Sequence, residues 1–215
     1  MAKHSVFNTY LFVSTGALAS ATAKPITSIT NAKPPVVTSA THGLKSGDVI
    51  ALAGTGSEEL DTVYIVEKID ETSFMLANDD WSDRMAISSA TGLTFTQQAI
   101  SQFCDVTSMD IDPLKISYDD DVTLCSRSKT SKKEYGTIGV DANWLPKSQF
   151  QRMLQSFLES QEKHIVGMKP AKSDTIYAWR VMLSQFQRSG DADDKFEAGL
   201  EWQVDSTEAI VDLVP

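Results

Sequence analysis

Acidic side chains come nearest to a chemical site in this 215-residue chain. Asp119, Asp120 and Asp121 are consecutive, and Asp110 and Asp112 precede them closely. Carboxylate oxygens are ligands of Ca²⁺ and Mg²⁺, but the EF-hand pattern with its central glycine and terminal glutamate is absent. We therefore interpret this stretch as a solvated acidic loop and predict neither a metal nor a cofactor.

The histidines and cysteines do not form a metal or catalytic set. His4, His42 and His164 lie at no ligand spacing from one another or from a cysteine. We expect His42 in a surface turn and His164 near the end of a helix. Cys104 and Cys125 fit no zinc module and are either two buried free thiols in a reducing compartment or a single disulfide.

Sequence patterns of enzymes are also missing. The chain has no G-x-S-x-G elbow and no P-loop, and Gly54-x-Gly56 lacks the rest of a dinucleotide fingerprint. The carboxylate pairs Glu58-Glu59 and Asp79-Asp80 occur in turn-like segments, where a solvated role is commoner than acid–base catalysis. We predict that the protein is not an enzyme.

One basic segment stands out between two predicted strands. Residues 126–134 are polar and lack aromatic side chains, which single-strand nucleic-acid binders use for stacking. We expect a hairpin with a long, mobile tip, which either contacts an acidic neighbouring subunit or is simply mobile. The residues predicted to make this contact are Arg127, Lys129, Lys132 and Lys133.

The charge balance argues against a protein that grips nucleic acid. The formal net charge is -10 and the isoelectric point is about 4.7. Residues 25–97 carry four basic and ten acidic residues, so no basic domain is hidden in the average. No apolar run approaches the roughly 20 residues of a membrane span, and we interpret Tyr10–Val13 as part of a first strand, not as a leader peptide.

Periodic patterns predict a mainly β fold with one helix. Alternation of apolar and polar residues predicts strands over 135–144, 175–183 and 197–204. Apolar residues at i, i+3, i+4, i+7 and i+8 from Phe150 predict an amphipathic helix, with Ser148 and Gln151 at capping-box spacing. A short strand is expected at 164–168.

Residues 25–97 read as a separate small β block. Short runs rich in β-branched and aromatic residues alternate with glycine and proline turns, which is typical of a small sandwich or open barrel. The strands are expected over 36–38, 48–53, 63–66, 73–76 and 93–96.

The remainder of the chain resembles the tail tube proteins of long-tailed bacteriophages. The order of elements carries this resemblance: an N-terminal strand at 10–15, then Cys104-Asp-Val-Thr107, the acidic stretch, a polar loop, a strand, a helix after Trp144-Leu-Pro146, and closing strands. It implies a discontinuous tail tube domain, a β-sandwich or barrel built from residues 1–24 and 98–215.

Residues 25–97 resemble a small β-module that recurs in phage tail proteins and is related to a barrel-like half-domain of ubiquitin-activating enzymes. The run His42-Gly43-Leu44-x-x-Gly47-Asp48 is the most specific part of this resemblance. It marks a tight turn, in which the glycines permit the backbone path and the aspartate can bond to the local backbone. The resemblance implies an inserted domain on the outer surface, without thioester chemistry because the block has no cysteine.

Together the resemblances imply a structural virion protein. Tail tube subunits form stacked rings, hexameric in the family, with a continuous inner β-barrel that the tape measure protein and then DNA pass through. The implied partners are further copies of the chain, the tape measure protein, and tail terminator or tip proteins. The implied location is the host cytoplasm before assembly and then the virion tail.

Three other functions stay open from the sequence. The first is a tail-tip or adaptor protein that binds a host surface, and the second is the tube protein of a contractile injection machine. The third is a hydrolase of surface polymers, for which the sequence offers no convergent acidic pair.

Overall fold

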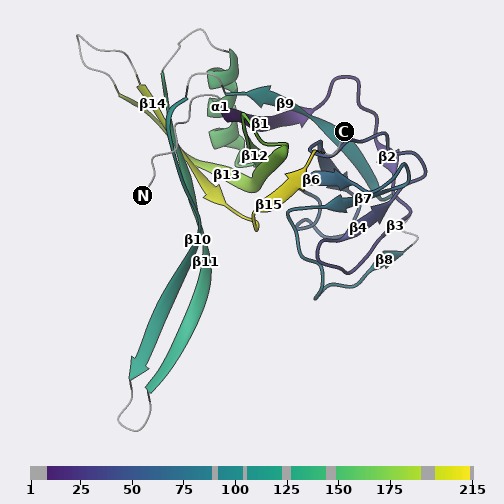
Figure 1. The fold of residues 1–215 in the computed structure, drawn as a ribbon, viewed down its shortest axis with the longest axis horizontal. Helices are drawn as coiled ribbons and strands as arrows, with labels where there is room; N and C mark the ends of the chain where they lie inside the picture. Colours follow the sequence, from purple (N-terminus) through teal and green to yellow (C-terminus); the bar gives the residue numbers. More distant parts are fainter. Residues whose placement is uncertain are drawn as a thin grey trace. The chain divides into compact units, whose positions relative to one another are not determined.

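The computed structural model describes residues 9–88, 92–103, 106–122, 127–143, 149–189 and 197–213. It is mainly β, with one α-helix in the described part, as predicted (Figure 1). The elements are β1 Thr9–Ala17, β2 Lys24–Pro25, β3 Ser28–Ile29, β4 Val36–Thr38, β5 Val49–Ala53, β6 Val63–Lys68, β7 Ser73–Leu76, β8 Ile87–Ser88, β9 Thr94–Gln102, β10 Val106–Val122, β11 Arg127–Asn143, α1 Gln149–Ser160, β12 Lys163–Pro170, β13 Thr175–Ser189, β14 Glu197–Val204 and β15 Ala209–Asp212.

The chain divides into two compact units. The first comprises Met1–Asp105, Glu162–Val181 and Ser206–Pro215, and the second comprises Val106–Gln161 and Met182–Asp205. Strand β13 begins in the first unit and ends in the second. The strand order in the first unit is β13-β12-β1-β9-β5-β6-β7-β4-β3-β8, with β15 on β13 and β2 on β9.

Two apolar cores stabilise the first unit. The larger one lies inside the block of residues 25–97, where Tyr64, Phe74 and Trp81 have no exposed surface. The second core joins side chains of that block to side chains of β1, β12, β13 and β15. Its buried members are Phe12, Val49, Ile65, Ile165, Ile176, Ala178, Ala209 and Val211.

The second unit is built on the antiparallel strands β10, β11, β14 and the later part of β13. The predicted alternation of β14 is confirmed, because its buried side chains are every second residue from Ala198 to Val204. The predicted helix is confirmed as α1, which buries Leu154 and Phe157. The Gln151 side chain donates from Nε2 to the backbone oxygen of Asn143, at 2.8 Å.

The hairpin is confirmed, but its predicted loop is mostly strand. The predicted acidic loop at Asp119–Asp121 is likewise wrong, because these residues belong to β10 and pair with β11. Residues Arg127–Asn143 form β11 and pair continuously with β10 out to the pair Val122–Arg127 (Figure 1). The loop prediction over 126–134 was wrong in extent because a search for alternating apolar residues recognises only strands with one buried face. Pairing of β11 with β14 begins at Thr137, so the earlier residues of β11, from Arg127 on, pair with β10 alone among the described strands.

Strand β13 is buried on both faces in the first unit. The sequence predicted one buried face with Tyr177, Trp179, Val181 and Leu183; the last three are buried, whereas Tyr177 is half-buried. Ala178 and Arg180 on the opposite face are also buried. The opposite face is buried because the second core and an ion pair pack against it. Predictions that involve Cys104, Cys125, Ser148 and the Trp144–Pro146 segment lie outside the described residues.

Glycine at position 47 is predicted to be required by both conformation and packing. Its φ is +89°, and a Cβ there would lie 2.8 Å from Ile176 Cδ1 and 3.0 Å from Leu213 Cδ2. Gly56 has a similar φ of +83° but open space around its Cα. Gly47→Ala should therefore lower the free energy of unfolding by about 2–4 kcal/mol, and Gly56→Ala by about 1–2 kcal/mol. Urea denaturation of both variants tests this, and equal losses would contradict the packing contribution.

Candidate functional site

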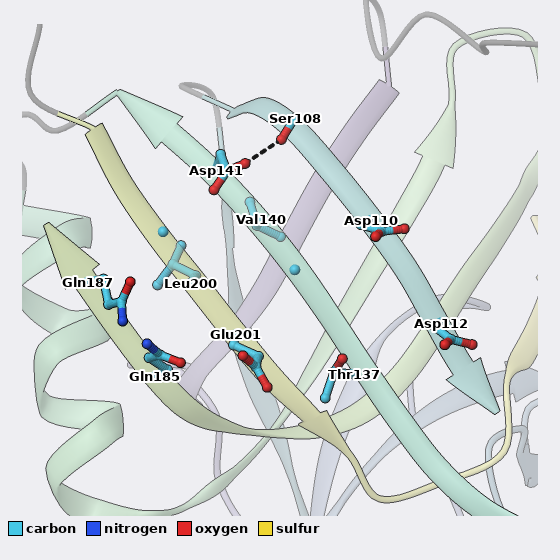
Figure 2. Close-up of a pocket in the computed structure, with 12 residues that line it drawn as sticks. Ser108, Asp110, Asp112, Thr137, Val140, Asp141, Gln185, Gln187, Leu200 and Glu201 are labelled. Carbon is cyan, nitrogen blue, oxygen red and sulfur yellow. Dashed lines mark hydrogen bonds between the residues drawn. The ribbon is translucent and has the colours of Figure 1, made fainter. Parts of the chain in front are cut away.

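A shallow polar depression lies on one face of the sheet in the second unit (Figure 2). Its volume is about 270 Å³, and β10, β11, β13 and β14 all contribute to its lining. The lining residues are Ser108, Asp110, Asp112, Thr137, Gly139, Val140, Asp141, Gln185, Gln187, Gly199, Leu200 and Glu201.

Strand register places the acidic residues in rows across the sheet. The pairing sets Ser108 beside Asp141 and Gly199 in one row, and Asp110 beside Gly139 and Glu201 in the next. Directly paired residues of neighbouring strands share a face. The third row consists of Asp112, Thr137 and Gln203.

The electrostatic character of this face is uniformly acidic. Asp110, Asp112, Asp141 and Glu201 are all exposed, and none of the lining residues is Lys or Arg. The Ser108 hydroxyl donates to Asp141 Oδ2 at 2.6 Å, so that one carboxylate is oriented by its neighbouring strand (Figure 2). We refer to this surface, residues 108, 110, 112, 137, 139, 141, 199, 201 and 203, as the acidic face.

Two glycines keep the acidic face open. A Cβ on Gly139 would lie 3.9 Å from Asp110 Cβ, and one on Gly199 would lie 3.6 Å from Asp141 Oδ1. Both are ordinary contacts, so neither glycine is imposed by a steric clash. Their effect is to leave gaps between carboxylates on adjacent strands, which produces the depression.

The opposite face of the same strands is apolar. Ile138, Val140 and Ala142 of β11 are buried, as are the alternate residues of β14 that include Leu200 and Trp202. The sheet therefore presents acid on one side and a packed core on the other. The lining includes no histidine or lysine that could act as a base toward Ser108, and the described residues contain no group of three His, Cys, Asp or Glu arranged to hold a metal ion.

The predicted turn motif lies in the first unit, away from the lining of this depression. Its histidine is only 1% exposed, so the prediction of a surface turn was wrong for His42. His42 Nε2 donates to the Asp70 carbonyl at 2.6 Å, and Nδ1 accepts from the Leu44 N–H at 3.0 Å. The ring satisfies backbone groups of two loops, which is a tertiary role that the turn pattern does not reveal.

The rest of the motif forms a tight turn. Gly43 and Gly47 both have positive φ, +66° and +89°. The Asp48 Oδ2 atom accepts from the Lys45 N–H at 2.9 Å, while partial burial raises the pKa of Asp48 above its usual range. The strand predicted at 164–168 is confirmed as part of β12, which follows helix α1. His164 lies in this strand and is buried, with its Nδ1 3.0 Å from the Ser14 carbonyl, and burial lowers the pKa of His164.

We call the part of the β10–β11 hairpin formed by residues 113–136 the arm. The four basic residues predicted to contact a neighbour lie on β11 within this arm, before its pairing with β14 begins at Thr137. Arg127 pairs with Val122 and Lys129 with Asp120 across the hairpin. Lys132 and Lys133 pair with Ser117 and Ile116.

Sequence patterns identified the members of the acidic face separately but did not assemble them. The polar sides of β11 and β14 were predicted, and Asp110 and Asp112 were noted as acidic. Only the register of three strands brings them onto one surface.

Comparisons with known structures gave several matches, among them two weak likenesses. No protein-family model and no curated protein matches the chain. A chain in the virion of a native gene transfer agent particle is 9% identical with a TM-score of 0.41, covering 52% of this chain and 88% of its own length. A chain in the anti-feeding prophage baseplate is 6% identical with a TM-score of 0.38, covering 82% and 99%. Because both TM-scores lie below 0.5, neither likeness assigns a family or function.

No helix in the described part is long and apolar enough to cross a membrane.

The two faces of β14 should respond differently to substitution. Glu201→Gln on the acidic face should change the free energy of unfolding by no more than about 0.5 kcal/mol, because the carboxylate is solvated. Leu200→Ala, one residue away on the buried face, should cost about 2–5 kcal/mol. Chemical denaturation measures both, and a Glu201→Gln loss as large as that of Leu200→Ala would show that the acidic face holds the fold together.

Proposed function

We propose that this protein is a structural virion component that self-assembles into stacked rings and forms the tail tube of a long-tailed bacteriophage. The observation that carries the proposal is a sheet with one acidic solvated face and an open edge. The resemblance of residues 1–24 and 98–215 to tail tube proteins supplies the ring architecture, hexameric in that family. Residues 25–97 are then an inserted domain on the outside of the tube.

The open edge supplies the means of assembly. Strand β10 ends the strand order and has only β11 as a partner among the described strands. Its 17 residues therefore leave a long row of backbone donors and acceptors unpaired. Such an edge associates readily with another strand. Pairing with the next copy around a ring would satisfy these groups and close the sheet into a barrel.

The hairpin arm extends this argument to a second neighbour. From Asp112 to Val122, β10 continues for about 33 Å beyond the row that contains Thr137, at roughly 3.3 Å per residue. Two-stranded ribbons without further support are marginally stable in water. Contact with an adjacent ring would support the ribbon, and its Lys and Arg residues would meet the surface of a chain with net charge -10.

The acidic face suits the inner wall of such a tube. Carboxylates directed at a channel repel DNA phosphates, so that DNA passes without specific binding. The tape measure protein would occupy the channel first, and terminator or tip proteins would close the ends. This role requires no catalysis and places the protein in the virion tail after assembly from the host cytoplasm.

Shortening the arm should abolish assembly without unfolding the protein. The variant replaces residues 115–134 by Asn-Gly, a two-residue turn that suits a hairpin between Leu114 and Tyr135. Negative-stain electron microscopy over a concentration series should show rings or tubes for the wild type and isolated subunits for the variant. The far-ultraviolet circular dichroism signal, divided by the number of strand residues, should be the same for both proteins and shows that the variant is folded. Tubes of the shortened variant would contradict the role of the arm. Wild-type particles that are compact at every concentration would favour an adaptor function instead.

Charge reversal on the arm should impair stacking of the rings. Lys132→Glu with Lys133→Glu should leave a folded subunit but shorten the filaments, because repulsion replaces attraction toward an acidic neighbour. The matched control reverses two exposed lysines of the first unit, Lys45 and Lys172, and changes the net charge equally. Filament lengths in electron micrographs provide the readout, and wild-type lengths for the arm variant would refute the contact.

A further inference from the structure

Residues 25–97 are joined to the rest of the first unit without a flexible linker on one side. Strand β9 pairs with β5 of that block through Thr94–Gln97, and the same strand pairs with β1 from Gln98 to Gln102. One continuous strand therefore belongs to both partners. A rigid strand transmits orientation in a way that a loop cannot.

The two partners also share an apolar core. Val49 and Ile65 come from the block, whereas Phe12, Ile165 and Ile176 come from β1, β12 and β13. The close approach of Gly47 to Ile176 and Leu213 belongs to the same contact. Removal of the block would leave these side chains exposed to water.

An ion pair with a buried guanidinium crosses this contact. Arg180 of β13 is 7% exposed, and its Nη1 lies 3.5 Å from Oδ2 of Asp79, a half-buried residue in the loop after β7. The guanidinium carbon is 5.4 Å from the centre of the Tyr64 ring, a cation–π geometry. The Trp81 indole N–H also donates to Asp79 Oδ2, at 3.3 Å.

Further polar contacts lie at the same junction. The Arg180 N–H donates to Ser206 Oγ at 2.9 Å, and the Thr207 hydroxyl donates to the Asn78 carbonyl at 3.5 Å. Three segments far apart in the sequence thus meet around Arg180. Apolar burial has no preferred direction, whereas a buried charge must meet its partner in a defined geometry.

We infer that residues 25–97 are an obligatory part of the first unit, and that the buried Arg180–Asp79 contact fixes their orientation on β13. The shared core supplies the attraction between the partners. The ion pair favours the arrangement in which the Arg180 guanidinium meets the Asp79 carboxylate over arrangements that separate them. This inference does not depend on the proposed tube function.

The test compares two neighbouring aspartates in the full chain. Asp80 pairs with Lys33 on an exposed surface, so Asp80→Asn is the matched control for Asp79→Asn. Asp79→Asn should lower the melting temperature by about 10 °C, because the loss of one member of a buried pair costs several times more than that of a surface pair. Asp80→Asn should lower it by no more than about 2 °C.

A double variant distinguishes loss of the interaction from loss of packing. The double variant Asp79→Leu with Arg180→Met removes both charges, so its melting temperature should lie above that of Asp79→Asn. If Asp79→Asn does not fold, the double variant should still fold. Hydrogen exchange should show equal opening free energies for amides of β6 and β12 in the wild type, because both belong to one cooperative unit. The inference would be overturned by any of three results. These are equal effects of the two aspartate substitutions, a double variant no more stable than Asp79→Asn, and independent exchange of the β6 and β12 amides.

Discussion

Backbone hydrogen bonding between antiparallel strands is the constraint on which this structure depends. Buried backbone N–H and C=O groups must find hydrogen-bond partners, and the order of strands shows which strands the chain pairs on both sides by itself. Strand β9 pairs with both β1 and β5, and β13 carries β12 and β15. Among the described strands, β10 has β11 as its one partner, and its other edge is free to pair with a further strand.

The sheet of the second unit separates two requirements by the alternation of its side chains. Leu200 and Val140 provide the packing that holds the strands, while Glu201 and Asp141 on neighbouring positions remain solvated. Changes on the acidic face can therefore adjust its charge with little effect on stability. The proposed tube wall would need this independence, because its inner surface would have to suit the cargo while the fold stays constant.

Buried polar groups set the geometry of the first unit. His42 bonds to two backbone groups at one end of the block, and Arg180 meets Asp79 at the contact with β13. Neither interaction is needed for apolar burial itself. Each one adds direction to a core whose attraction is otherwise insensitive to orientation.

Local patterns determined those parts of the protein in which a single element decides its own structure. Helix α1, strand β14 and the turn at Gly47–Asp48 follow from residue spacing, since periodic burial and turn conformation act over a few residues. The acidic face, the extent of the β10–β11 arm, and the burial of His42 and Arg180 required the tertiary structure. These features depend on strand register and on contacts between residues up to about a hundred positions apart, and no local pattern records which strand will lie beside which.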